Sequence, residues 1–273
     1  MNQKKLTQLI EESYKSMDIK TETIPVPITI IKPIINLSKD QECSLLNGDG
    51  QSNPLEYKQI NSSTGLAVNY FKILESTEKI SNLVFENKVE KPLKSKGGKP
   101  ANLDVSYLKD GILYYVESKF LEPYYSSNEH NRDAYFVKEN YDVHEEHKND
   151  WLKLLETAQQ FKLYNFSQIC RHLMAIWRKH KDDDQKIVFR SVTWKMSDSF
   201  IEKKIDSKYK EDCIARRNEI EKESKRCNEV VNIFLNKIGW NSITFECLYY
   251  DDILDDIKES KDYEEFKKRY FID

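Results

Sequence analysis

The sequence predicts an α/β domain with helical additions, and three observations support this fold class. Segments rich in Val, Phe and Tyr, which favour strands, alternate with segments whose apolar residues recur at helical spacing. Aromatic residues make up 12% of the chain against only seven Gly and seven Pro, so this is not a disordered type of sequence. The 273 residues are enough to bury a large core as one unit. We therefore expect a single domain over residues 1–273.

Residues 1–60 predict a helix followed by an extended arm. The segment 4–17 has apolar residues at helical spacing, namely Leu6, Leu9, Ile10 and Tyr14. Residues 24–36 are β-rich but interrupted by Pro, which restricts them to an edge strand or an extended arm. The Gly-rich residues 47–50 then indicate a loop.

Residues 61–195 contain the elements that we assign to the core. A helix begins after Ser62 or Ser63, since either hydroxyl can cap its N-terminus. A flexible basic loop, 91–100, separates the first predicted strand from the second. The predicted strands cover 83–90, 101–108, 112–120 and 186–194, and two further helices cover 151–163 and 167–180.

Residues 196–273 predict a long charged helix, a last strand and a C-terminal helix. The long helix runs from Ser197 to Ile238 and ends at Gly239, as a C-cap would require. Its apolar residues form one stripe, so we interpret its many charges as a solvated face. The strand covers 242–250 and the last helix 255–269.

The composition bears on partners and location. Lys and Arg total 43 against 46 Asp and Glu, so no overall positive field attracts nucleic acid, and any such contact must come from local patches. The five cysteines are far apart and form no CxxC pair, which favours inert thiols in a reducing compartment. No signal peptide and no apolar segment long enough to span a bilayer is present. We expect a soluble cytoplasmic protein without membrane contact.

The two strands in the middle of the core predict a reactive centre. A two-residue turn at Asp110-Gly111 sets Lys109 opposite Ile112, and counting outward sets Asp104 opposite Glu117. Two carboxylates so placed repel each other unless a cation compensates them. Alternation along the strand then puts Lys119 on the same face as Glu117. The alternative is a solvated hairpin face with ordinary charges.

Two carboxylates and an amine on one face suit metal-assisted hydrolysis of a phosphodiester. Mg²⁺ prefers oxygen ligands and keeps several waters, so one or two carboxylates can hold it. Lys119 would position the attacking water or stabilise developing negative charge.

The segments ANLDV and YVESKFLEP, preceded by SSTGLAVNYF and LVFE and followed by QICRHL, resemble the PD-(D/E)xK nuclease superfamily, in particular its bacterial restriction endonucleases. The resemblance covers about residues 60–200. It implies a restriction-endonuclease-like mixed central β-sheet flanked by helices, here with a long charged helix added. It also implies Mg²⁺, for which Mn²⁺ substitutes, held by Asp104, Glu117 and the carbonyl of Ser118, with Lys119 assisting the attacking water.

Other residues enter through the same resemblance or through local chemistry. Many members carry one more acidic residue, for which Glu86 and Glu75 are the candidates. The resemblance suggests that Gln168 faces the active site, although a polar pair with His172 packed beside the sheet is the alternative. Candidate DNA contacts are the loop lysines and two tyrosines, unless they are only a solvated loop and packed rings: Lys94, Lys96, Lys99, Tyr124 and Tyr125.

Three functional hypotheses remain from the sequence. The first is a Mg²⁺-dependent endonuclease that hydrolyses DNA, expected to be double-stranded, in restriction or anti-phage defence. A homodimer would suit it, because cutting a duplex needs two active sites or two events. The second is a catalytically inactive nucleic-acid-binding or structural module of the same fold. The third is a nuclease subunit that waits for a partner or signal, with the long helix as the assembly surface.

Overall fold

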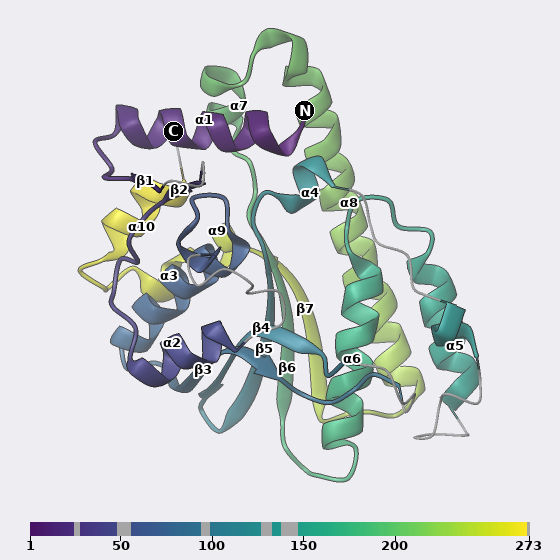
Figure 1. Cartoon of the computed structure of the whole chain (residues 1–273). Helices are drawn as coiled ribbons and strands as arrows, with labels where there is room; N and C mark the ends of the chain where they lie inside the picture. Colours follow the sequence, from purple (N-terminus) through teal and green to yellow (C-terminus); the bar gives the residue numbers. More distant parts are fainter. Residues whose placement is uncertain (25–27, 48–55, 94–98, 127–132, 138–146, 272–273) are drawn as a thin grey trace.

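Five strands form the central sheet, in the order β3-β4-β5-β6-β7 (Figure 1). Neighbours from β3 to β5 are antiparallel, whereas β5, β6 and β7 are parallel, so the sheet is mixed as the sequence predicts. The strands are β3 Ser81–Lys88, β4 Asn102–Lys109, β5 Ile112–Lys119, β6 Ile187–Thr193 and β7 Ile243–Tyr249. The structure is a computed structural model that describes residues 1–24, 28–47, 56–93, 99–126, 133–137 and 147–271.

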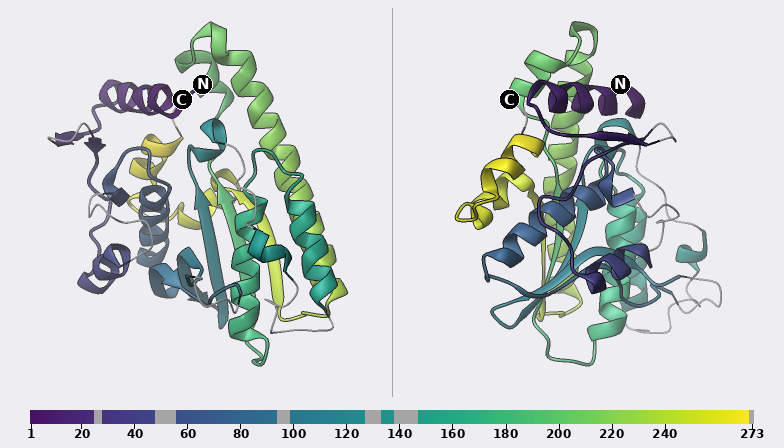
Figure 2. Two further views of the ribbon diagram at one scale, coloured as in Figure 1. Left: turned by 45° about the vertical axis from the view of Figure 1, so that its right-hand side comes forward. Right: turned by 60° about the vertical axis from the view of Figure 1, so that its left-hand side comes forward.

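Helices cover both faces of this sheet (Figure 2). One face carries α3 (Ser63–Ser76), on which α10 (Tyr263–Tyr270) packs, together with α9 (Tyr250–Ile253) and the 3₁₀ turn η5 (Leu254–Ile257). The other face carries α5 (Lys148–Ala158), α6 (Phe166–His180) and α8 (Ser207–Lys237). Among the described helices, none is both long enough and apolar enough to cross a membrane.

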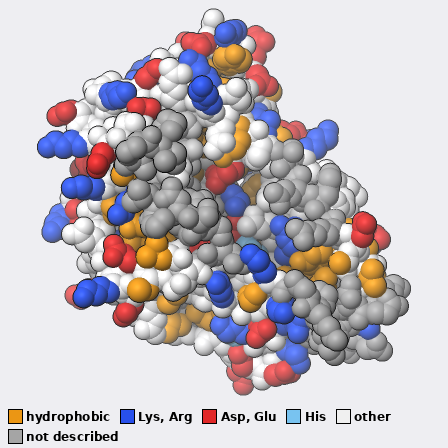
Figure 3. All heavy atoms as spheres, viewed as in Figure 1, with side chains coloured by type: hydrophobic (Ala, Val, Ile, Leu, Met, Phe, Trp, Pro, Cys, Tyr) orange, Lys and Arg blue, Asp and Glu red, His pale blue; other side chains and the backbone are white. Residues whose placement is uncertain are grey.

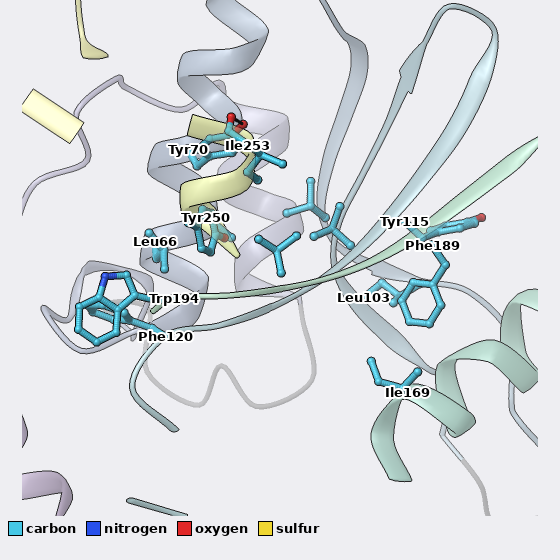
Figure 4. Close-up of a cluster of buried hydrophobic side chains, with 14 of the residues drawn as sticks. Leu66, Tyr70, Leu103, Tyr115, Phe120, Ile169, Phe189, Trp194, Tyr250 and Ile253 are labelled. Carbon is cyan, nitrogen blue, oxygen red and sulfur yellow. Dashed lines mark hydrogen bonds between the residues drawn. The ribbon is translucent and has the colours of Figure 1, made fainter. Parts of the chain in front are cut away.

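The hydrophobic core lies on both sides of the sheet (Figure 4). On the α3 side, Leu66 and Tyr70 pack near Tyr250, and all three are at most 1% exposed. On the α6 side, Tyr115 and Phe189 are fully buried neighbours on β5 and β6. As predicted, α3 begins after Ser62, whose hydroxyl accepts a hydrogen bond from the Gly65 N–H. A sheet covered on both faces has mostly buried central strands.

The N-terminal part of the chain lies outside this sheet. It contains α1 (Gln3–Ser16), then a short antiparallel pair of β1 (Glu22–Ile24) and β2 (Ile28–Ile30), where the sequence predicted a single arm. The helix α2 (Lys39–Leu46) and the 3₁₀ turn η1 (Glu56–Lys58) follow, neither of which was predicted. Most of the loop expected at 47–50 falls outside the described residues.

Three predicted helices differ from those in the structure. The C-terminal helix expected at 255–269 is shortened to α10 (Tyr263–Tyr270), which the 3₁₀ turn η5 (Leu254–Ile257) precedes. The long charged helix is interrupted, with α7 (Asp198–Lys204) preceding α8, because buried Ile205 adopts an extended conformation between them. The helix expected at 151–163 ends at Ala158, which leaves residues 159–165 as a connection beside the sheet. Two short elements between β5 and α5, α4 (Glu122–Tyr125) and η2 (Asp133–Phe136), were also not predicted.

Candidate active site

The turn between β4 and β5 sets the register of the candidate site. Asp110 and Gly111 both have positive φ, 52° and 76°, as a two-residue hairpin turn requires. Pairing runs from Lys109 opposite Ile112 to Val105 opposite Val116, so the next positions along the two strands are Asp104 and Glu117. The hairpin therefore has the register that the sequence predicted.

Three carboxylates lie at one level across three neighbouring strands. Phe85 pairs with Val105 and Asn87 with Leu103, which puts Glu86 of β3 beside Asp104 of β4. Glu86 has a φ of 51°, although its neighbours Phe85 and Asn87 keep one continuous register with β4. Its carboxylate accepts hydrogen bonds from the Asn102 amide and, at 3.4 Å, from the Thr64 hydroxyl. Glu86 therefore lies on the strand next to the two carboxylates of the central hairpin.

Lys119 and Asp104 are held by groups of the same hairpin. The Lys119 Nζ lies 2.5 Å from Oε1 of Glu117, whose side chain is only 2% exposed. The Asp104 Oδ2 accepts a hydrogen bond of 2.6 Å from the Ser118 N–H. The Ser118 side chain points to the opposite face, where its Oγ lies 2.8 Å from the Tyr250 hydroxyl. Only the main chain of Ser118 can therefore belong to the candidate site.

Two buried polar atoms of the site lack a hydrogen bond within the described structure. They are Oε2 of Glu117 and Nδ1 of His172, which lie 3.2 Å apart without hydrogen-bond geometry. Burial lowers the pKa of His172 to about 4, so the imidazole is neutral at pH 7 and forms no ion pair with Glu117. Unpaired buried polar atoms are costly, and a bound cation or water would relieve that cost.

The electrostatics of the site favour a positive charge near Asp104. Burial, and after it the negative charge of Glu117, raises the pKa of Asp104 well above its ordinary value. Burial alone would lower the pKa of Lys119, but Glu117 and Asp104 outweigh it and raise that pKa. Lys119 is therefore positively charged near pH 7.

The donor set fits a hard divalent cation that keeps most of its waters. Within the described ranges, no three His, Cys, Asp or Glu side chains are gathered closely enough to hold a metal ion by themselves. Asp104 and Glu117 supply two carboxylates, and the unpartnered Oε2 of Glu117 is available to a cation. Mg²⁺ is commonly held by one or two carboxylates with water and substrate oxygens completing six ligands.

Two adjoining cavities meet at this site. The acidic cavity, of about 340 Å³, is lined by Glu86, Asp104 and His172 among others, and the flanking cavity, of about 380 Å³, by Tyr125 and Tyr164 among others. Both cavities share four lining residues, namely Glu117, Lys119, Gln168 and Arg171. Figure 3 shows acidic and basic side chains together in a hollow on this face. A bound strand could thus pass Glu117 and Lys119 from one cavity to the other.

The structure brings most of the predicted site residues together. Gln168 lines both cavities, and its Oε1 accepts a hydrogen bond from Asn165, so it does not merely pack beside the sheet. Lys99 lines the acidic cavity and Tyr125 the flanking cavity. Glu75 is bound to Lys72 and Gln41 instead, so Glu86 is the remaining candidate for the additional acid. Lys94 and Lys96 lie outside the described residues.

The prediction of a nucleic-acid contact by Tyr124 is wrong. Its side chain is 3% exposed, and its hydroxyl accepts a hydrogen bond of 2.8 Å from the Met196 N–H. The ring also contacts Trp194 edge to face. Tyr124 is therefore a core residue, whereas its neighbour Tyr125 lines the flanking cavity.

Arg171 is the main residue of the site that the sequence analysis missed. It lies three residues after Gln168 on α6 and lines both cavities. Residues three apart share a helix face, so the assignment of Gln168 to the site already implied Arg171. Tyr164 and Asn165 were missed because the preceding helix was expected to extend to residue 163.

A mixed sheet whose central hairpin carries two carboxylates and a lysine, with helices on both faces, defines a restriction-endonuclease-like fold. The chain belongs to the family described as restriction endonuclease associating with ARP, which matches residues 29–271. No curated protein and no solved structure matches it.

Proposed function

We propose that this protein is a Mg²⁺-dependent endonuclease of the PD-(D/E)xK class that hydrolyses phosphodiester bonds of double-stranded DNA. Family membership supports nuclease activity and a DNA substrate. One observation carries the chemistry: Asp104 lines the acidic cavity beside Glu117 and Lys119, which lie where the two cavities meet, and Oε2 of buried Glu117 has no hydrogen-bond partner in the described structure. A cation bound there would remove both the charge repulsion and the unpaired oxygen.

Each residue of the site has a role in this proposal. Asp104, Glu117 and the carbonyl of Ser118 hold Mg²⁺, for which Mn²⁺ can substitute. When bound, the ion supplies Lewis-acid activation of the phosphate and a lower pKa for attacking water. The Lys119 ammonium, anchored by Glu117, orients that water and stabilises the developing negative charge. Glu86, beside Asp104 on the neighbouring strand, adds negative charge to the acidic cavity.

Substrate binding is assigned to the polar and basic residues around the junction of the cavities. Arg171 and Lys99 carry positive charge toward the backbone phosphates, and Gln168 offers an amide donor between them. Tyr125 presents a half-buried ring in the flanking cavity, where it can contact a sugar or a base. These local charges replace the overall positive field that the chain lacks.

The biological setting rests on the family description alone. It supports a role in restriction or anti-phage defence and association with ARP, so we propose both for this chain. Cutting both strands of a duplex also favours a homodimer, which size-exclusion chromatography with light scattering would detect. All five cysteines are free, which suits a reducing compartment such as the cytoplasm.

The direct test is cleavage of plasmid and phage DNA with Mg²⁺, Mn²⁺ or EDTA. We expect metal-dependent cutting that Glu117→Ala and Lys119→Ala each lower by at least ~100-fold, because each removes a group that acts at the reacting phosphate. Lys109→Ala is the matched control, since it changes a lysine of the same hairpin at the distant turn. Thermal melting confirms that each variant is folded.

A Mg²⁺ titration separates this proposal from an inactive binding module. We expect the unmodified chain to bind Mg²⁺ and Glu117→Gln to lose that binding, whereas Lys119→Ala still binds the ion. If the unmodified chain binds duplex DNA but neither cuts it nor binds Mg²⁺ or Mn²⁺, the protein is a non-catalytic module and the nuclease proposal is wrong.

A further inference from the structure

The long helix α8 contacts both walls of the flanking cavity. One wall is the segment 123–126 after β5, which carries Tyr125, and the other is the connection 162–165 before α6, which carries Tyr164. Two charged residues on one side of α8, Arg216 and Glu223, each bind one of these walls. These two charged side chains therefore bind other parts of the protein and do not belong to a solvated helix face.

The side chain of Glu223 binds the main chain of the wall that precedes α6. Its side chain is buried, with 5% of the residue exposed, and its two carboxylate oxygens accept three hydrogen bonds of 2.8 to 2.9 Å. The donors are the consecutive N–H groups of Lys162, Leu163 and Tyr164. Three such bonds compensate the buried carboxylate and fix the path of this connection.

The same wall leads directly to the candidate site. The Tyr164 hydroxyl donates a hydrogen bond of 2.6 Å to Ser191, which pairs with Glu117 in the sheet. The next residue, Asn165, caps α6 and donates through its side-chain amide to Gln168. Displacing the connection would therefore move Gln168, a residue that lines both cavities.

Arg216 binds the opposite wall. Its Nε donates a hydrogen bond of 2.8 Å to the Pro123 carbonyl, and its NH2 group donates to the Ser126 carbonyl. These two acceptors flank Tyr125 on α4, four to seven residues beyond Lys119. Arg216 and Glu223 are seven residues apart, so their Cα atoms lie about 10 Å apart along the helix axis.

We propose that Arg216 and Glu223 are positioning residues that set the width of the flanking cavity, and so the binding of the DNA strand beside the cut. This inference rests on the proposed nuclease function. Neither side chain contacts Asp104, Glu117 or Lys119, so we assign neither of them a role in binding the metal or the attacking water. One helix holds both walls, so losing either contact opens the same cavity.

Cleavage kinetics on a short duplex test this inference in the full-length protein. We expect Arg216→Ala and Glu223→Gln each to raise KM about tenfold and to change kcat less than about twofold, because uniform binding is lost while the chemistry is kept. Arg216→Lys should recover part of the loss, since an ammonium reaches one of the two carbonyls. Lys222→Ala is the control, because Lys222 is exposed on the same helix beside Glu223.

A double variant separates positioning from simple stabilisation. Arg216 and Glu223 share no partner, so their effects on the free energy of unfolding should add. Their effects on KM should not add, because the second substitution alters a cavity that the first has already opened. Hydrogen exchange should show faster exchange at the amides of residues 162–164 in Glu223→Gln but unchanged exchange in Lys222→Ala.

The outcomes distinguish this inference from the proposed function. Absence of cutting by the unmodified chain counts against the nuclease itself. Suppose that the unmodified chain cuts DNA. If both single variants then cut with an unchanged KM, α8 only stabilises the fold and the inference is overturned. The same conclusion follows if both single variants have a lower kcat and their effects on KM add in the double variant. Unchanged Mg²⁺ affinity in both variants is part of the expected result.

Discussion

At the level of single residues, the candidate site is unfavourable for the protein that binds no cation. Asp104 is half-buried next to Glu117 and Glu86, and the ammonium of Lys119 is bound to Glu117. His172 adds a neutral nitrogen without a hydrogen bond in the described structure. Groups arranged in this way are typical of functional sites, where local stability is given up for chemistry.

We expect Asp104→Asn to stabilise the metal-free protein at pH 7 by on the order of 1–3 kcal/mol. The pKa of Asp104 is raised in the folded state, so its contribution to stability is full below its ordinary pKa and is lost as the pH rises through the folded value. Asparagine removes that loss and can still accept the Ser118 hydrogen bond. Urea unfolding with and without Mg²⁺ measures this change in the free energy of unfolding. A destabilised variant, or one that Mg²⁺ still stabilises, would contradict it.

His172 should make the protein sensitive to acid. Its pKa is lowered to about 4 by burial, so its contribution to stability is full above its ordinary pKa of 6.5 and is lost as the pH falls toward 4. Asp104 acts in the opposite direction over this range, so the comparison belongs in the Asp104→Asn background. There, we expect His172→Asn to flatten the fall in unfolding free energy between pH 6.5 and 4, measured with urea. An unchanged slope would mean that the pKa of His172 is the same in the folded and the unfolded protein.

At the level of elements, α8 shows what sequence periodicity can and cannot predict. The hairpin of β4 and β5 was predicted with its register because a two-residue turn fixes it locally. The burial of Glu223 was not, because its partners lie about 60 residues earlier in the chain. The interruption at Ile205 also depends on burial by distant segments. Local pattern thus predicted Asp104, Glu117 and Lys119, whereas contacts between distant elements determined which charges of α8 are buried.

The helix α8 also covers the edge of the sheet formed by β7. The Asn228 side chain accepts a hydrogen bond of 3.1 Å from the Cys247 N–H on β7, and one turn later Asn232 donates at 3.0 Å to the Phe245 carbonyl. These amides occupy positions that a sixth strand would otherwise use. An edge strand with unpaired groups is a template for association between chains.

We expect Asn228→Ala to lower the free energy of unfolding by about 1–2 kcal/mol, because it leaves the Cys247 N–H without its acceptor. It should also increase aggregation on mild heating, which light scattering detects. Asn218→Ala, on an exposed position of the same helix, is the control and should change neither quantity. Equal behaviour of the two variants would mean that water replaces the Asn228 amide without cost.

At the level of the whole molecule, the C-terminal helix links segments from both halves of the sequence. The Trp194 indole donates a hydrogen bond of 2.6 Å to the Tyr270 carbonyl, and the Asn69 amide donates one of 2.7 Å to the Tyr270 hydroxyl. Arg269 donates to the Lys32 carbonyl, next to the N-terminal strand pair. These contacts favour the single domain that the sequence predicted, which remains to be tested.

We expect one cooperative unfolding transition, with the same midpoint by far-UV circular dichroism and by tryptophan fluorescence. Tyr270→Ala should lower the free energy of unfolding by about 3–5 kcal/mol and shift both midpoints together, since it removes a buried ring and the hydroxyl that accepts a hydrogen bond from Asn69. Lys267→Ala, at an exposed position of α10, should have little effect. Two separate transitions would divide the chain into more than one unit.

Arg216 and Glu223 of α8 bind only main-chain atoms of the two walls: N–H groups at 162–164 and the carbonyls of Pro123 and Ser126. Any amino acid supplies such a carbonyl, and any except proline supplies the N–H. The side chains at Tyr125 and Leu163 can therefore be exchanged without loosening the scaffold that carries them. A combinatorial library at these two positions would be a direct route to altered sequence preference, with Arg216 and Glu223 left unchanged.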